Sequence, residues 1–173
     1  MKEGTIQILA RLALATFVQV WIFHHLVVAN GWVSPLFHLY GLVLLPLRMR
    51  PFVYLFAGGV VGFAVDIMQI GGGLFTSAGL MTGYLQPLIA RLLAPREGYE
   101  PEMEAGPQQL GWSWWIIYVL LISASHSIWL FALEAGRWGL LPHAIGQALT
   151  SSFATTLLIV VVQALFARNR SRR

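Results

Sequence analysis

The chain of 173 residues contains no cysteine, and charged residues make up only 10% of it. The lack of cysteine excludes disulfides, thiol nucleophiles and cysteine-ligated metal sites. The scarcity of charge excludes an ordinary soluble domain, in which about 25% of residues are charged. Hydrophobic residues are abundant instead, at 57% of the chain with a mean hydropathy of +0.69. The composition therefore predicts an integral membrane protein, in which the net charge of +4 reports topology and does not indicate nucleic-acid binding.

The sequence also lacks the common motifs of catalysis. It has no HExxH, GxSxG, GxGD, Walker or aspartate-rich phosphotransfer pattern. The histidines show no metal-ligand spacing beyond one adjacent pair; they are His24, His25, His38, His126 and His143. We therefore expect no catalytic residue, no metal and no cofactor. An enzymatic function would need Asp66, His126 and Glu134 to converge in the fold.

Long apolar runs predict an all-α polytopic protein with a single transmembrane domain over residues 1–173. Six transmembrane helices are expected, at about 6–28, 33–47, 52–70, 74–93, 112–134 and 143–166. The first run lacks an A-x-A cleavage site, which favours a retained anchor over a signal peptide. The second run, at 33–47, is shorter than the roughly 17 to 25 residues that a span needs, so a re-entrant or broken element is the alternative. We take it as a short crossing, because Arg48 and Arg50 then fall on the same side as Lys2.

The basic residues predict the orientation of these segments. One side of the six-segment arrangement carries Lys2, Arg48, Arg50, Arg91, Arg96 and the four arginines of the tail 167–173, whereas the other side carries Arg137. Arg11 is counted within the membrane, where its side chain can snorkel to the interface. Because positive charge gathers on the cytoplasmic side, both termini and the loop 94–111 are expected to be cytoplasmic.

Glycines at helical spacing form the most distinctive pattern. Gly58, Gly62 and Asp66 are four residues apart, and Gly79 and Gly83 repeat the spacing after the turn 71–73. Such faces let two backbones approach closely, so they predict helix packing between 52–70 and 74–93, or the binding of a partner helix. Two interpretations of Asp66 stay open: its carboxylate caps the glycine turn, or it is a paired intramembrane charge that fixes helix packing or a partner.

Two further polar groups stand out. His126, with its serine neighbours, is expected to form a helix–helix hydrogen bond rather than a proton relay. Ser152 and Thr155 belong to a patch of the last helix that is expected to join helices; its other members are Thr150, Ser151 and Thr156. The loop 94–111, with Arg96, Glu97 and Tyr99, is expected to be a solvated linker more than a docking site.

Several stretches resemble the MreD family of rod shape-determining proteins. They are the glycine helix GGVVGFAVDIMQIGGGL, the loop ARLLAPREGYEP and the segment YVLLISASHSIWLFALE, so that the similarity covers most of the chain. One departure lies after the turn, where many members have a histidine and this chain has Gly73-Leu74-Phe75-Thr76. The resemblance implies a multi-pass protein of the bacterial cytoplasmic (inner) membrane, with a fold similar to the S components of energy-coupling-factor transporters.

The function that the resemblance implies is a non-enzymatic scaffold of the rod-shape, or elongation, complex. Such a scaffold binds the bitopic protein MreC directly, and through it MreB, RodA and the penicillin-binding transpeptidase, so that it supports peptidoglycan synthesis and regulation of cell shape. Membrane lipid is the other expected partner, and nucleic acid is not expected. The alternative function is a small-molecule, vitamin-like binding subunit of a membrane transporter, which would need a closed pocket open toward the outer face.

Overall fold

The computed structural model describes residues 2–23, 31–100 and 103–170, and these parts of the chain contain helices and no strand. The elements are α1 (Lys2–Trp21), α2 (Leu39–Val43), α3 (Pro51–Gln69), α4 (Leu74–Leu92), α5 (Pro107–Leu110), α6 (Trp112–Ala135), the 3₁₀ helix η3 (Trp138–Leu140) and α7 (Leu141–Arg170). Five of the six segments expected from the apolar runs thus correspond to long helices. The part of the first segment at 24–28, with His24 and His25, and the tail residues 171–173 lie outside the described residues.

Four of the described helices are long and apolar enough to cross a membrane. They contain Gly4–Trp21, Pro51–Gln69, Trp112–Ala135 and Trp138–Leu165. Helix α4 is as long as α3, at 19 residues, but it carries Thr82, Gln86 and Arg91 among its apolar residues. The protein is therefore an all-α protein with several helices suited to a membrane.

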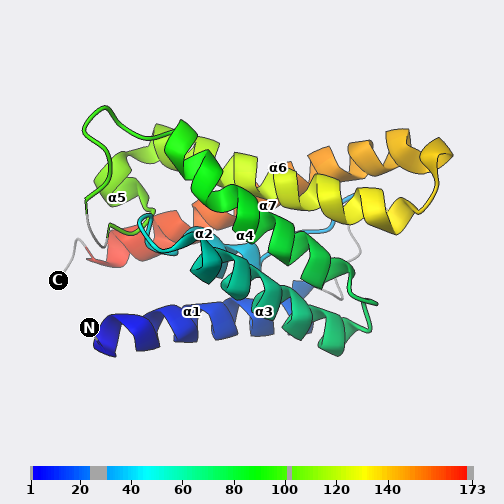
Figure 1. Ribbon diagram of the computed structural model, residues 1–173, viewed down its shortest axis with the longest axis horizontal. Coiled ribbons are helices and arrows are strands. Elements are labelled where there is room, and N and C mark those ends of the chain that lie inside the picture. Colours follow the sequence, from blue (N-terminus) through cyan, green and yellow to red (C-terminus); the bar gives the residue numbers. More distant parts are fainter. Residues whose placement is uncertain (1, 24–30, 101–102, 171–173) are drawn as a thin grey trace.

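The long helices form an elongated bundle with two distinct ends (Figure 1). Helix α1 begins and α7 ends at the end that also holds α5 (Figure 1). We call it the arginine end, because Arg91 lies in the last turn of α4 there, and Arg48, Arg50 and Arg96 lie in the adjoining loops. The opposite end holds the turns at 70–73 and 136–140. The most extensive packing joins α3 to α4, followed by α6 to α7 and α4 to α6.

The expected helix over 33–47 is wrong in its secondary structure. Only Leu39–Val43 is helical, and the rest of residues 31–50 is irregular. The segment nevertheless passes through the interior: it starts beside Gln147 of α7, where Gly31 accepts a hydrogen bond, and ends beside the loop at Met103. Its central side chains are buried, and Leu36, Leu39, Leu42, Val43 and Leu45 are almost completely so. We call residues 31–47 the buried segment.

Side chains of neighbouring helices satisfy the irregular backbone of the buried segment. Thr155 and Ser151 of α7 accept hydrogen bonds from the backbone N–H of Leu36 (2.9 Å) and Ser34 (3.0 Å). The amide oxygen of Gln19 in α1 accepts from the N–H of Phe37 and, at 3.4 Å, of His38. Non-helical backbone is tolerated at membrane depth only when protein groups satisfy it in this way. These polar side chains are therefore the reason that a short, broken segment fits inside the bundle.

The later part of the loop at the arginine end packs against the bundle, whereas its first part, at 94–98, is exposed as expected of a solvated linker. The N–H of Leu47 donates to the carbonyl of Met103 at 2.8 Å, and Ala105 is fully buried. Both terminal nitrogens of Arg11 lie 3.0 Å from the carboxylate oxygens of Glu104 in this loop. This two-point ion pair joins α1 to a residue 93 positions away, so the loop contributes to the position of α1.

Candidate functional site

Four glycines that the sequence pattern predicted to pack line the contact between α3 and α4, which we call the seam. They are Gly58, Gly62, Gly79 and Gly83. A Cβ atom built on Gly58 would overlap the carbonyl oxygen of Gly79, and one built on Gly79 would overlap that of Gly58. A Cβ on Gly83 would likewise overlap the carbonyl of Tyr54. The backbones of α3 and α4 are therefore in direct contact, as the spacing of the glycines predicts, and no larger residue fits between them.

Asp66 lies at the end of this seam that is opposite the arginine end. Its carboxylate accepts hydrogen bonds from the backbone N–H groups of Phe75 (3.1 Å) and Thr76 (2.7 Å) and from the hydroxyl of Thr76. Both N–H groups lie in the first turn of α4, where a helix has no internal acceptors for them. Gly71 permits the arrangement, because a Cβ there would overlap a carboxylate oxygen. Asp66 thus acts as a capping residue for α4 from the preceding helix, which agrees with the first of its two interpretations.

We expect Asp66→Ala to destabilise the protein by about 1–2 kcal/mol, the usual cost of removing a helix N-cap. Thr76→Val is the matched control, because it removes only the hydroxyl bond and leaves both backbone bonds to the carboxylate. The measurement is thermal or denaturant unfolding of each purified variant in the same detergent. An Asp66→Ala protein of unchanged stability that no longer supports function would contradict the capping role and favour partner binding.

The outward face of α3, opposite the glycines, is apolar and exposed. It carries large side chains at helical spacing, namely Phe52, Phe56, Val60, Phe63 and Ile67. Because the inward face is held against α4 by backbone contacts, α3 presents this aromatic face on a fixed support. We call these five residues the α3 outer face.

His126 lies in a buried polar cluster that the sequence alone did not reveal. The cluster consists of His38, Thr82, Ser123, His126 and Ser127. Its ring nitrogen Nδ1 is 2.8 Å from the hydroxyl oxygen of Thr82 in α4, which gives the expected helix–helix hydrogen bond. The ring of His38, from the buried segment, packs edge-on against that of His126 with 5.0 Å between centroids. Sequence reasoning found no second titratable group for His126, because His38 lies 88 positions earlier (126 − 38).

The cluster contains more polar atoms than the described protein groups satisfy. Both ring nitrogens of His38, Nε2 of His126 and the hydroxyls of Ser123 and Ser127 are buried without a hydrogen-bond partner among the described residues. The hydroxyl of Thr82 also donates to the carbonyl of Ala78 at 2.8 Å. A hydroxyl has one proton, so when Thr82 donates to Ala78, Nδ1 of His126 is the donor to Thr82 and Nε2 of the neutral ring is a hydrogen-bond acceptor. The cluster therefore has both acceptor and donor capacity in the middle of the bundle.

The serine and threonine patch of α7 divides into two groups. Thr155 and Ser151 face the buried segment and bond its backbone, as described above. Ser152 instead donates to the carbonyl of Leu149 at 2.9 Å, within its own helix. The expectation that this patch joins helices therefore needs correction: the partner of Thr155 is irregular backbone, and Ser152 has a local bond.

The loop residues Arg96, Glu97 and Tyr99 do not form a single site. Arg96 and Glu97 are exposed, whereas Tyr99 is half-buried and donates to the carbonyl of Ala90 in α4 at 2.6 Å. Partial burial raises the pKa of Tyr99, which keeps its hydroxyl protonated as a donor. Its ring packs edge-on against Trp114 of α6. Tyr99 therefore ties the loop to two helices.

The three residues that an enzymatic function would need are not brought together. Asp66 contacts the first turn of α4, and His126 contacts Thr82 two turns further along that helix. Glu134 is exposed on α6 and lies eight residues beyond His126, about 12 Å along the helix axis. Within the described parts of the chain, no group of three or more metal-ligating side chains occurs either.

Comparisons of the chain with protein-family models, with curated proteins and with solved structures give no match.

Proposed function

We propose that this protein is a non-enzymatic membrane scaffold of the MreD type, which binds the transmembrane helix of MreC in the rod-shape complex. Through MreC it would contact MreB, RodA and its penicillin-binding transpeptidase, and so support peptidoglycan synthesis and cell shape. The proposal places it in the bacterial inner membrane with six crossings, which are the five long helices and the buried segment. An even number of crossings keeps both termini on one side, and the arginine end is then cytoplasmic.

The observation that carries the proposal is the α3 outer face. It offers three phenylalanines on one side of the helix, of which Phe56 is 62% and Phe63 is 58% exposed. The glycine seam holds this helix rigidly against α4. Aromatic side chains on a rigid support lose little conformational entropy when a partner packs on them. A single transmembrane helix is long enough to cover the whole face, because α3 itself spans 19 residues.

The alternative function, a vitamin-like binding subunit, needs an interior pocket open toward the outer face. The space among α1, α4, α6 and α7 is filled by the buried segment, whose leucines are almost fully buried. Two surface grooves beside α4, described below, lie at the arginine end, which is the cytoplasmic end of the proposed topology. These features favour the scaffold.

Site-directed cross-linking tests the proposal directly, because the chain has no native cysteine. Phe63→Cys on the α3 outer face is expected to cross-link in membranes to a cysteine scanned along the MreC transmembrane helix. Phe153→Cys on α7 is the matched control, since Phe153 is also an exposed phenylalanine, at 67%, on a different helix. We expect cross-linking from position 63 to exceed that from position 153 at least about fivefold, a preference of about 1 kcal/mol.

Two results would count against the scaffold. MreC that fails to co-purify under conditions that retain other complex members would remove the partner. Equal cross-linking from positions 63 and 153 would remove the α3 outer face as its site.

A further inference from the structure

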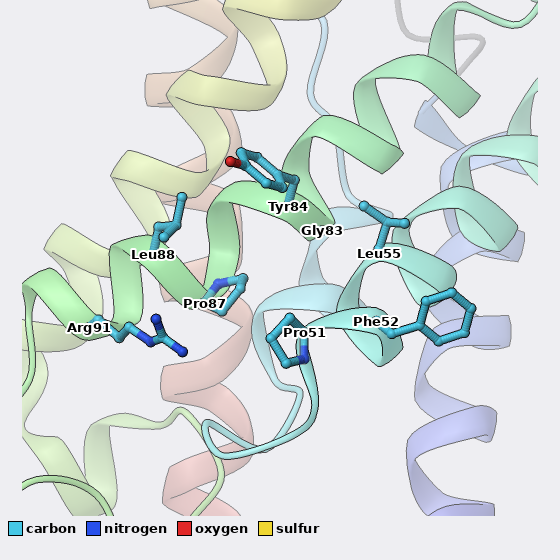
Figure 2. Close-up of a pocket in the computed structure, with 8 residues that line it drawn as sticks. All are labelled: Pro51, Phe52, Leu55, Gly83, Tyr84, Pro87, Leu88 and Arg91. Carbon is cyan, nitrogen blue, oxygen red and sulfur yellow. The ribbon is translucent and has the colours of Figure 1, made fainter.

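A groove runs along the outer side of the α3–α4 seam at the arginine end (Figure 2). It encloses about 320 Å³ and its walls come from the first turns of α3 and the last turns of α4. Its lining residues are Pro51, Phe52, Leu55, Gly83, Tyr84, Pro87, Leu88 and Arg91. A second groove of about 270 Å³ adjoins it, shares Pro51, Pro87 and Arg91 with it, and extends to Arg48 and Tyr99.

The groove exists because two of its residues cannot fill it. Gly83 has no side chain, and its place in the seam does not allow one, since a Cβ would overlap the carbonyl of Tyr54. Pro87 has no backbone N–H, so the carbonyl of Gly83 lacks its usual helical partner and α4 can bend there. Gly83 holds α4 in contact with the start of α3, and the bend that Pro87 permits lets the last turn of α4 diverge beyond that contact and leave the space of the groove.

The walls of the groove are suited to hydrocarbon. Phe52, Leu55 and Leu88 are apolar, and Tyr84 presents its ring from α4 (Figure 2). The groove faces away from the bundle core, because Phe52 and Tyr84 are both largely exposed. A groove of about 320 Å³ between two packed helices accepts a flexible chain of methylene groups more readily than a helix about 10–12 Å across.

The charge at the Arg91 end of the groove is positive. Arg91 lines both grooves and Arg48 lines the second, and neither groove has an aspartate or glutamate among its lining residues. Arg48 also donates to the carbonyl of Tyr99 at 3.4 Å, which holds its side chain near the second groove. Two guanidinium groups at one end of an apolar channel complement a phosphate group with an attached acyl chain.

We infer that an anionic glycerophospholipid binds at this place, with one acyl chain in the α3–α4 groove and its phosphate at Arg48 and Arg91. The inference goes beyond the proposed scaffold and does not depend on MreC. In the proposed topology, the site lies at the cytoplasmic end of the helices, where a phospholipid headgroup meets the hydrocarbon. Juxtamembrane arginines are attracted to anionic lipids, and a shaped groove adds selectivity to that attraction.

The test uses the full chain, purified in detergent and stripped of lipid, and titrated with phosphatidylglycerol or phosphatidylcholine of the same acyl chains. Native mass spectrometry measures binding of each lipid. The unaltered protein is expected to bind phosphatidylglycerol several times more tightly than phosphatidylcholine. Arg91→Gln is expected to reduce that preference about fivefold, and Arg48→Gln with Arg91→Gln to abolish it.

Two controls separate a site from general surface charge. Arg96→Gln removes an exposed arginine of the same end that lines neither groove, so it should leave the preference unchanged. Leu55→Trp fills the groove without changing charge and should weaken binding of both lipids. Inorganic phosphate, which has no acyl chain, should not compete with phosphatidylglycerol at equal concentration.

Any of three results would overturn the inference. They are equal binding of the two lipids by the unaltered protein, an effect of Arg96→Gln as large as that of Arg91→Gln, and full competition by inorganic phosphate. Each variant is first checked for a single peak in size-exclusion chromatography. If the double variant does not fold, Arg91→Gln alone and Leu55→Trp still decide the question.

Discussion

Among glycine-to-alanine substitutions in α3 and α4, Gly62→Ala is expected to cause the largest loss of stability. A Cβ at this position would overlap the carbonyl oxygen of Phe75, and it would lie 2.6 Å from the carbonyl carbon of Phe75 and 2.8 Å from the Cα of Thr76. All three are backbone atoms, which cannot rotate away, so α3 and α4 must separate. Overpacking of this kind costs about 1–3 kcal/mol or more, and it also moves the first turn of α4 away from Asp66.

Gly59→Ala is the matched control on the same helix. Its nearest obstacle is the tip of the Leu80 side chain, at 2.9 Å, which can change rotamer. Alanine also favours a helix over glycine by about 1 kcal/mol, so this variant should be as stable as the unaltered protein or slightly more so. Thermal unfolding in detergent measures both. Equal melting temperatures for the two variants would show that the seam is not closely packed at Gly62.

Thr155→Val is expected to destabilise the buried segment by about 1–3 kcal/mol, because it leaves the N–H of Leu36 buried without an acceptor. Valine has nearly the same shape as threonine, so the change removes the acceptor while keeping the packing. Inside a membrane bundle, water is not at hand to replace the lost acceptor. Gln19→Leu should cost more, since it removes the acceptor for two N–H groups, those of Phe37 and His38.

Thr156→Val provides the control for this loss. Thr156 is also buried, but its hydroxyl donates to the carbonyl of Ser152 in its own helix, and that carbonyl keeps its helical N–H partner. Unfolding of the two variants by denaturant in mixed micelles gives the comparison. If Thr156→Val is as destabilising as Thr155→Val, the hydrogen bond to Leu36 contributes nothing specific.

Part of the candidate site was visible in the sequence because it depends on local spacing. The glycines at 58, 62, 79 and 83 lie four apart on two helices joined by a short turn, so they face each other in almost any packing of the pair. Asp66 follows the same spacing and therefore reaches the start of α4. These predictions needed only the helical period and the length of the turn.

The residues that sequence reasoning missed act across large distances along the chain. Gln19 and His38 meet at the buried segment, and Arg11 meets Glu104, but no periodic pattern links the members of these pairs. One signal was available: Gln19 and Gln86 are polar residues within apolar runs, and such residues are costly in a membrane unless they have a partner. Gln86 donates to the carbonyl of Leu42 at 2.7 Å, so it too serves the buried segment.

By itself, the sequence determined that this is a helical protein with helices apolar enough to cross a membrane, where its long helices lie, and which faces of α3 and α4 meet. Hydropathy and the helical repeat are properties of consecutive residues, so they can be read without the fold. Only the tertiary structure decided that residues 31–47 cross the bundle as broken chain and that His38 lies beside His126. It also decided that the α3–α4 seam opens into a groove beside Arg48 and Arg91. The physical reason is that an irregular backbone is stable only where acceptors from other helices reach it, and a groove exists only where neighbouring side chains fail to fill it.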